Sequence, residues 1–177
     1  MEMQEYDFTL KFKLQEVNGD PNNYVEKLGM EGCDDALVGV GCKGQIGLNF
    51  TRTAISAYQA IYSAIRDVKK AIPNATLTEA KPDLVGLTDV AMLLKFSRQN
   101  MRKIMIKSGG SFPTPIYDGT PTLWHLADIL IWLRDSLDYP LDDSLLEVAK
   151  INMNLNIAHD FQKADPKIQE QIKELIA

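Results

Sequence analysis

The sequence has no long hydrophobic run and very little cysteine. No apolar stretch approaches the roughly 18 residues that a membrane-spanning helix requires. The acidic start Met1–Glu5 also lacks the apolar core of a secretion signal, so we expect a cytoplasmic protein with no membrane partner. Cys33 and Cys42 are nine positions apart, which fits neither a CxxC redox motif nor a zinc knuckle. Free thiols are therefore favoured over a functional disulfide.

Motifs for catalysis, cofactors and metals are also scarce. His125 and His159 lack the HExxH spacing of zinc proteases, and no Ser-His-Asp or Cys-His arrangement stands out. The acidic residues within Glu31–Asp35 have no histidine nearby, so a polar loop is favoured over a metal or acid–base site. Gly39–Gly44 matches GxGxxG, but a strand-like segment follows where a dinucleotide site needs a helix. We expect neither an enzyme nor a bound cofactor or metal.

Acidic charge dominates the chain, but one segment is basic. The formal net charge is −5. Residues 82–135 nevertheless carry six basic and five acidic side chains, and Met92–Phe112 has no acid at all. The cations of this segment are Lys95, Arg98, Arg102, Lys103 and Lys107. A basic island in an acidic protein suggests contact with a polyanion, although a solvated helix face would have the same composition.

Residues 6–80 predict an α+β domain with the order β-α-β-β-α-β. From Tyr6 to Leu14 apolar and polar residues alternate, which is typical of a strand with one buried face. The other predicted elements are a helix started by Asp20-Pro21, strands over Ala36–Val40 and Ile46–Phe50, a long helix capped by Thr53, and a strand over Thr76–Thr78. This order is that of the split βαβ, or ferredoxin-like, arrangement, to which we assign residues 1–81.

Residues 82–136 predict three helices and a hairpin. The predicted helices are a brief one capped by Thr88, a second that follows a break at Lys95-Phe96 and runs from Ser97 to Gly109, and a third over Trp124–Leu133. Phe112–Leu123 holds three prolines and an Asp-Gly turn, which predicts a tight β-hairpin between the last two helices.

Residues 137–177 predict a C-terminal helical tail. Ser144–Glu147 has the pattern of a capping box, which predicts a helix that runs to about Phe161. Asparagines alternate with apolar residues over Ile151–Ile157, so a strand is the alternative there, but asparagine is poor in strands. Asp165-Pro166 starts a last helix with apolar residues along one side.

One stretch of the chain resembles a known DNA-binding motif. Leu84–Ala91 and Leu94–Arg102, with the hairpin and the Trp124–Leu133 helix behind them, are similar to the winged helix-turn-helix of the MerR and phage-excisionase type. The resemblance covers residues 84–133 and implies a DNA-binding domain over residues 82–136. One position departs from it, because many such turns favour a positive φ and use glycine where this chain has Lys95.

The second helix of this motif is the predicted reader of DNA. Met101, Ile104 and Met105 would anchor it to the core, and at about 100° per residue its opposite face then points outward. The residues expected to contact DNA are Ser97, Arg98, Gln99, Asn100, Arg102, Lys103 and Lys107. In the major groove, Arg or Lys binds guanine and Gln or Asn binds adenine. The capped helix start is also a natural place for a phosphate.

We therefore expect a sequence-specific bacterial transcriptional regulator that binds double-stranded DNA. One short helix reads only a few base pairs, so we expect a homodimer on two half-sites about 34 Å apart. The tail Leu141–Ile176, or an exposed sheet edge, would supply the dimer contact. Two alternatives remain: a protein-interaction module such as an antitoxin or adaptor, and a regulator whose N-terminal domain senses a small molecule.

Overall fold

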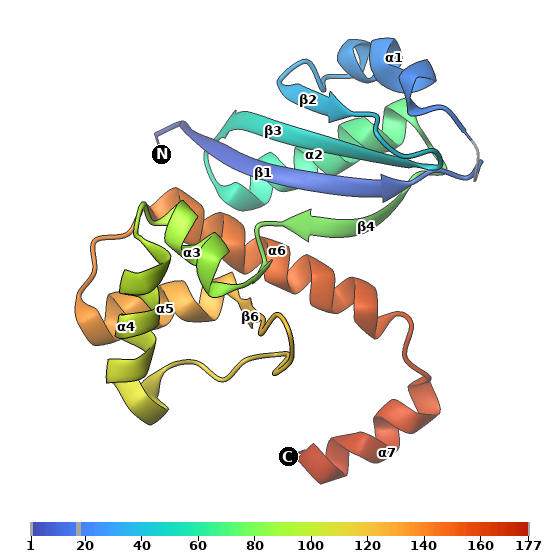
Figure 1. Cartoon of the computed structure of the whole chain (residues 1–177). Coiled ribbons are helices and arrows are strands. Elements are labelled where there is room, and N and C mark those ends of the chain that lie inside the picture. Colours follow the sequence, from blue (N-terminus) through green and yellow to red (C-terminus); the bar gives the residue numbers. More distant parts are fainter. Residues whose placement is uncertain (1, 17–18, 177) are drawn as a thin grey trace.

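The protein is a mixed α+β structure. A computed structural model describes residues 2–16 and 19–176. Within these ranges it contains a four-stranded antiparallel sheet, a two-stranded ladder and seven α-helices (Figure 1). Among the same residues, no helix combines the length and the apolar character needed to cross a membrane.

The sheet has the strand order β2-β3-β1-β4. Its strands are β1 Gln4–Lys13, β2 Ala36–Gly39, β3 Gln45–Ala54 and β4 Thr76–Lys81. On β1, every second side chain from Tyr6 to Phe12 is buried, as the alternating pattern predicted. The order of strands and helices along residues 4–81 is also the predicted one.

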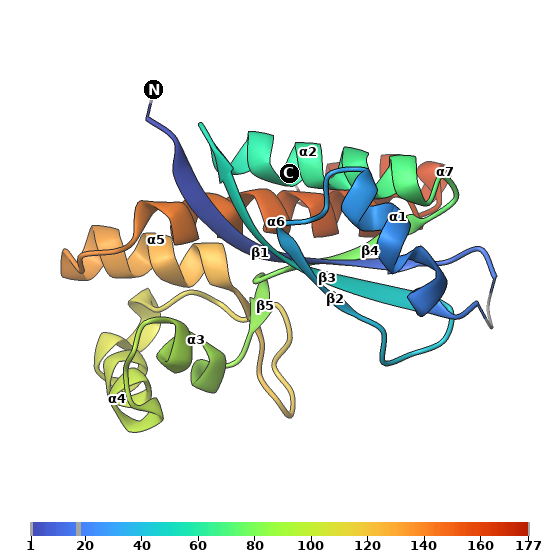
Figure 2. The same cartoon turned by 90° about the horizontal axis from the view of Figure 1, so that it is seen from above.

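Helices cover one face of this sheet. α1 (Val25–Met30) follows a 3₁₀ turn at Pro21–Tyr24, and the Asp20 carboxylate accepts from the backbone of that turn, as predicted. α2 (Ala57–Ala71) buries four alanines, which let its backbone approach the strands closely. α6 lies beside α2 and also contacts β1 and β4 (Figure 2).

Two predicted boundaries in this part are wrong. Thr53 does not cap α2, because it pairs with Glu5 in the β1–β3 ladder; the Ser56 hydroxyl caps the helix instead. β4 is longer than the predicted strand Thr76–Thr78, because Glu79–Lys81 also pairs with β1. Both errors underestimate how far the ladders of the sheet extend.

A second group of helices follows the sheet. Its elements are β5 (Leu84–Val85), α3 (Leu87–Leu93), α4 (Arg98–Ser108), a 3₁₀ turn (Gly109–Ser111), β6 (Trp124–His125) and α5 (Leu126–Leu137). They enclose a separate core around Val90, Met101 and Leu130. The predicted third helix began too early, because Trp124 and His125 pair with β5 and α5 starts only after them.

The segment between α4 and β6 is a loop closed by one β-bridge. Tyr117 and Leu123 exchange backbone hydrogen bonds, so the predicted hairpin is present only as this bridge. Phe112 anchors the loop, because its ring packs edge-on against Trp124 and Trp132 with centroids 5.9 Å and 5.1 Å away. The Trp124 indole also donates to the carbonyl of Pro113 at 2.9 Å.

α6 (Asp143–Phe161) belongs to both cores, and α7 (Pro166–Ile176) follows it. Val148 is buried in the core of the sheet, whereas Leu146 and Ala149 are buried in the core around α3, α4 and α5. The helix runs to Phe161 as predicted, and the strand alternative over residues 151–157 is wrong.

The start of α6 differs from the prediction. Asp142 is the N-cap and accepts from the backbone N–H of Ser144 at 2.9 Å, so Ser144 is inside the helix. Glu147 therefore does not close a capping box with Ser144. Its carboxylate accepts instead from the backbone N–H of Ala57 at 3.2 Å, at the first turn of α2. A side chain expected to cap its own helix thus caps a neighbouring one.

A buried polar cluster holds the linker between the two parts. The Asp83 carboxylate is 2.6 Å from Nδ1 of His125, and the Asn156 amide donates to its other oxygen at 2.7 Å. Asn156 also bonds both the N–H and the C=O of Ala80, each at 2.8 Å. Because β4 is an edge strand, this side chain occupies hydrogen-bonding positions that a further strand would use.

Arg52 joins β3 to the loop before β2 and to α2. It is 8% exposed, and its guanidinium forms ion pairs with Asp35 at 2.7 Å and Asp67 at 2.9 Å. It also donates to the carbonyl of Gly32 and the hydroxyl of Ser63. Burial alone would lower the pKa of Arg52, but the hydrogen bonds and charges of both carboxylates hold it above its ordinary value.

Candidate nucleic-acid interface

The candidate site begins with α3 and the turn that follows it. The Asp89 carboxylate accepts from the backbone N–H of Gly86 at 2.8 Å and fixes the start of α3. The predicted cap, Thr88, lies inside the helix and is exposed, because the acidic side chain at the third helical position reaches back to Gly86. The turn that follows is closed by the backbone N–H of Phe96, which donates to the carbonyl of Ala91 at 2.7 Å.

The turn has the positive φ that the resemblance implied. Lys95 has a φ of 57°, although it is not glycine. Phe96, next to it, packs edge-on against Tyr139 with ring centroids 5.1 Å apart. The Ser97 hydroxyl then accepts from the backbone N–H of Asn100 at 3.1 Å, which confirms Ser97 as the N-cap of α4. These contacts set the direction in which α4 leaves the turn.

α4 has one anchored face and one free face. Met101 is fully buried, and Ile104 and Met105 are half-buried against the same core. The seven residues expected to contact DNA are all exposed: Ser97, Arg98, Gln99, Asn100, Arg102, Lys103 and Lys107. The structure therefore places all of them on the solvent side of one short helix and its cap.

A groove runs along one side of α4. It has a volume of about 610 Å³ and is bounded by the start of α3, by α4 and by the loop 119–122. Arg98 and Arg102 line it, whereas Gln99 and Lys103 face solvent outside it. The sequence did not predict that this loop borders the groove, because no local pattern in the loop shows that it folds back toward α4.

At the tip of that loop, the ring of Tyr117 lies against the backbone of Gly119. A Cβ atom at Gly119 would collide with the ring of Tyr117, so the ring packs directly against the glycine. The Thr122 hydroxyl also donates to the carbonyl of Gly119 at 3.0 Å. The loop is thus a compact projection beside the groove.

The cations of α4 form no ion pair with the carboxylates that the structure describes. Among the described side chains, no carboxylate lies within 4.0 Å of the charged nitrogens of Arg98, Arg102, Lys103 or Lys107. Elsewhere in the protein many Lys and Arg side chains form ion pairs with carboxylates. Lys11, for example, lies 2.8 Å from Glu79, and that hydrogen bond raises the pKa of Lys11. The free face of α4 is therefore suited to an external anion.

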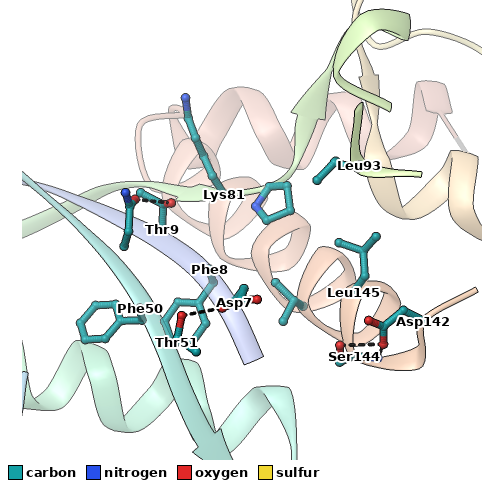
Figure 3. A pocket seen from close by; sticks show the side chains of 13 residues that line it. Asp7, Phe8, Thr9, Phe50, Thr51, Lys81, Leu93, Asp142, Ser144 and Leu145 are labelled. Carbon is teal, nitrogen blue, oxygen red and sulfur yellow. Dashed lines mark hydrogen bonds between the residues drawn. The ribbon is translucent and has the colours of Figure 1, made fainter. Parts of the chain in front are cut away.

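A second concavity lies where the sheet meets α3 and α6 (Figure 3). Its volume is about 450 Å³, and its walls include the exposed face of β1 and β3 and the linker Lys81-Pro82. Its polar groups bind one another, since the Thr51 hydroxyl donates to Asp7 and the Thr9 hydroxyl donates to Asn49, both at 2.7 Å. The crevice therefore offers a ligand mainly shape and apolar contact.

The acidic loop and the glycine-rich motif, which resemble a metal site and a dinucleotide site by sequence, have structural roles. Asp35, in the acidic loop, is held by Arg52. Gly39–Gly44 links β2 to β3, so it is the predicted hairpin connection. Among the described residues, no three His, Cys, Asp or Glu side chains come together as a metal site would require.

Comparison with known proteins assigns no family to this chain. No protein family, curated protein or solved structure matches it. Its function is therefore inferred from its own residues and their geometry.

Proposed function

We propose that this protein is a sequence-specific double-stranded DNA-binding regulator. In this proposal α3, the Lys95 turn and α4 are a helix-turn-helix, and the loop 112–123 is its wing. The observation that carries the proposal is that α4 is held by its apolar side while its exposed side presents only cationic, amide and small polar groups around Ile106. Of the functions considered, DNA binding uses this arrangement most directly.

The chemistry of α4 matches both parts of DNA recognition. Arg102 or Arg98 can donate two hydrogen bonds to guanine, and Gln99 can both donate to and accept from adenine; each such pair discriminates by about 1–3 kcal/mol. Lys103 and Lys107 carry point charges suited to phosphates, which fix register without reading sequence. Since both arginines line the groove toward the loop, a DNA strand seated there would contact the helix and the loop together.

The rest of the chain supports a regulator rather than a bare DNA-binding module. The strand order β2-β3-β1-β4 and the order of elements favour a ferredoxin-like arrangement for residues 1–81. α6 and the Asp83 cluster join this part to the helices around α4. An event on the sheet could therefore be transmitted to the DNA-binding part.

Selection of bound sites from a random duplex library tests the proposal. The selected duplex is then titrated with Arg102→Ala and Lys103→Ala at several salt concentrations. We expect weaker binding for both, and a log–log salt slope that falls by about 0.9 for each phosphate that a variant no longer neutralises. Lys69→Ala is the matched control, because Lys69 is an exposed cation on α2, outside the candidate interface.

Two results would count against this function. The first is failure of the wild-type protein to bind any duplex at low salt. The second is an equal loss of affinity in Lys69→Ala and Arg102→Ala, since that would show a diffuse charge effect and no specific reader.

We propose a second, lesser function for the crevice of Figure 3, which is to sense a small, largely apolar ligand. The observation that favours it is that both parts of the molecule contribute walls, including Thr51 from the sheet and Leu93 from α3. A ligand bound there would touch the DNA-binding part directly. A metabolite library that changes neither the melting temperature nor the DNA affinity would leave this function without support.

A further inference from the structure

α2 exposes a face made only of aromatic, amide and cationic side chains. The exposed residues of the helix are Tyr58, Gln59, Tyr62, Arg66, Lys69 and Lys70, which we call the α2 face. Within α2, which the structure describes in full, no exposed residue is acidic or aliphatic. The apolar residues of the helix pack on the sheet or against α6, and Ser63 and Asp67 accept hydrogen bonds from Arg52.

Two tyrosines form the first half of the α2 face. Tyr58 and Tyr62 are one turn apart, and their rings stack with centroids 5.8 Å apart and planes inclined by 15°. Although the rings cover one another, the two residues are still 59% and 55% exposed. Aromatic rings this open to water can stack on another flat ring, such as a nucleobase.

Three cations form the second half of the face. Arg66, Lys69 and Lys70 follow the tyrosines, and the one acidic residue of α2 is Asp67. Its carboxylate lies 2.9 Å from the buried guanidinium of Arg52, and farther from Lys70 and Arg66, at 3.5 Å and 4.0 Å. Among the described carboxylates, none lies within 4.0 Å of the Lys69 ammonium. This half of the face therefore carries positive charge that is free to meet an anion.

The aromatic and cationic halves share one side of the helix. At 3.6 residues per turn, Tyr58, Tyr62 and Lys69 point within about 40° of one another, and Arg66 lies a further 40° or so round the helix. From Tyr58 to Lys69 the helix rises about 16 Å. A ligand that runs along α2 thus meets the rings first and the cations next.

Neighbouring carboxylates lie at the margins of this face. Glu147 of α6 accepts from the backbone N–H of Ala57 and from the Tyr6 hydroxyl, which places it at the aromatic end of α2. The acidic loop 31–35 lies on the flank of Asp67, where that side chain contacts Gly32. Neither group lies among the cations at the end of the helix.

We propose that the α2 face binds single-stranded nucleic acid. Unpaired bases stack on Tyr58 and Tyr62, and Arg66 and Lys69 bind phosphates farther along the strand. Aromatic rings combined with a cationic track are the general means of binding single strands. A duplex offers this face only its phosphates, because its bases already stack on one another.

The composition of the α2 face favours this ligand over a protein. A second copy of the chain that met it face to face would bring two sets of the same three cations together, which is unfavourable. An apolar partner would find no exposed aliphatic side chain on the helix, and an acidic peptide would leave the rings without a flat partner. A nucleic acid strand uses both halves of the face.

This site is separate from the proposed reader of duplex DNA. α2 and α4 lie on opposite sides of the molecule (Figure 2). The inference therefore goes beyond the proposed function and does not depend on it.

Fluorescence anisotropy with a labelled oligothymidylate of about 15 nucleotides tests the proposal. We expect Tyr58→Ala and Tyr62→Ala each to weaken binding about fivefold or more, because each loses a stacked base. Tyr62→Phe is the matched control, since phenylalanine keeps the ring and should keep the affinity. An oligouridylate of the same length, titrated in parallel, distinguishes DNA from RNA as the preferred strand, and binding of either that depends on the tyrosines supports the proposal.

The cationic half is tested by salt dependence. Arg66→Ala should weaken binding and reduce the log–log salt slope by about 0.7 if one phosphate contact is lost. Lys13→Ala is the control, because Lys13 is an exposed cation on β1, outside the α2 face, and it should leave the slope unchanged. Equal slopes for Arg66→Ala and Lys13→Ala would overturn the assignment of the cations.

An abasic oligomer of the same length separates stacking from charge. It keeps the phosphates and lacks the bases, so wild-type protein and Tyr62→Ala should bind it equally weakly. The proposal is overturned if wild-type protein binds neither single strand at low salt, if Tyr62→Ala binds oligothymidylate as tightly as wild type, or if it loses as much affinity for the abasic strand. Unchanged circular dichroism confirms that the variants are folded.

The outcome is separable from that of duplex binding. Arg102→Ala should weaken the selected duplex and leave oligothymidylate binding unchanged, whereas Tyr62→Ala should do the reverse. A protein that binds single strands through Tyr62 but ignores every duplex leaves this site standing while the proposed function fails.

Discussion

Arg52 and Arg102 show two opposite uses of the same side chain. Arg52 is buried, and two carboxylates, a carbonyl and a hydroxyl accept its hydrogen bonds. Arg102 is exposed on α4, next to Lys103 and within a segment that holds no acidic residue. A buried guanidinium must have its partners inside the fold, whereas an exposed one stays hydrated until an external anion replaces the water. The paired arginine therefore serves stability, and the unpaired one is available for binding.

The largest expected effect comes from removing the paired arginine. Arg52→Met removes the buried cation shared by Asp35 and Asp67 and leaves Asp67 only its longer pairs with Lys70 and Arg66. We expect the free energy of unfolding to fall by about 3 kcal/mol, because the largely buried carboxylates keep their desolvation cost when this cation is removed. Urea denaturation measures this decrease. Arg66→Met is the control, since Arg66 is largely exposed and only 4.0 Å from Asp67. A decrease smaller than that of the control would mean that Arg52 is not structural.

The next effect tests the polar cluster at the linker. Asn156→Leu removes the partner of Ala80 and of one Asp83 oxygen, and we expect the free energy of unfolding to fall by about 2 kcal/mol, the cost of leaving buried polar groups unpaired. Amide hydrogen exchange should show faster exchange at Ala80. Asn154→Ala provides the comparison, because Asn154 is exposed and bonds only to the carbonyl of Lys150. Equal effects of the two substitutions would contradict the assigned role.

A smaller effect distinguishes the buried and exposed thiols. Burial raises the pKa of Cys33 to about 11, whereas Cys42 is exposed. The fold thus favours the neutral thiol, so this contribution to stability is complete below the unfolded pKa near 8.5 and is lost as the pH rises through about 11. At neutral pH, alkylation should label Cys42 alone in native protein and both cysteines in urea. Labelling of both in native protein would rule out this burial.

The smallest expected effect concerns the turn before α4. Lys95→Gly removes the strain of a positive φ, and we expect the free energy of unfolding to rise by about 0.5–1 kcal/mol. Lys95→Asn should give part of this gain, because asparagine tolerates the left-handed region. Thermal denaturation of both variants checks the order. If Lys95→Gly lowers the melting temperature, Lys95 makes a contact that outweighs the strain.

Local patterns predicted the elements that carry the candidate site. The alternation of β1, the cap at Ser97 and the apolar anchor Met101 depend on residues close in the chain, and the structure agrees with each. The first residues of the helices were predicted less accurately. At α2 and α6 several neighbouring Ser, Thr or Asp side chains could serve as the cap, and only the path of the preceding segment selects one. At α3 the N-cap is Gly86, and Asp89 inside the helix bonds back to it.

Long-range polar contacts could not be predicted from the sequence. Arg52 meets Asp35 and Asp67 across 17 and 15 residues, and Asn156 meets Asp83 across 73. No periodic pattern connects such residues, because their pairing depends on how whole elements pack. The three asparagines of α6 did stand out, but as a possible strand pattern. The bonds of Asn152 and Asn156 to the linker region depend on the helix lying beside β4.

The sharing of α6 between two cores has a consequence for dissecting this protein. A fragment cut at residues 82–136, the boundaries that the sequence suggests, would lack Leu146 and Ala149 and leave apolar surface on α5 open to water. Such a fragment should bind the dye ANS and lack a cooperative thermal transition, whereas a fragment that extends through Phe161 would keep this surface covered. The helices around α4 therefore cannot be excised alone, and any graft of them onto another scaffold must include α6.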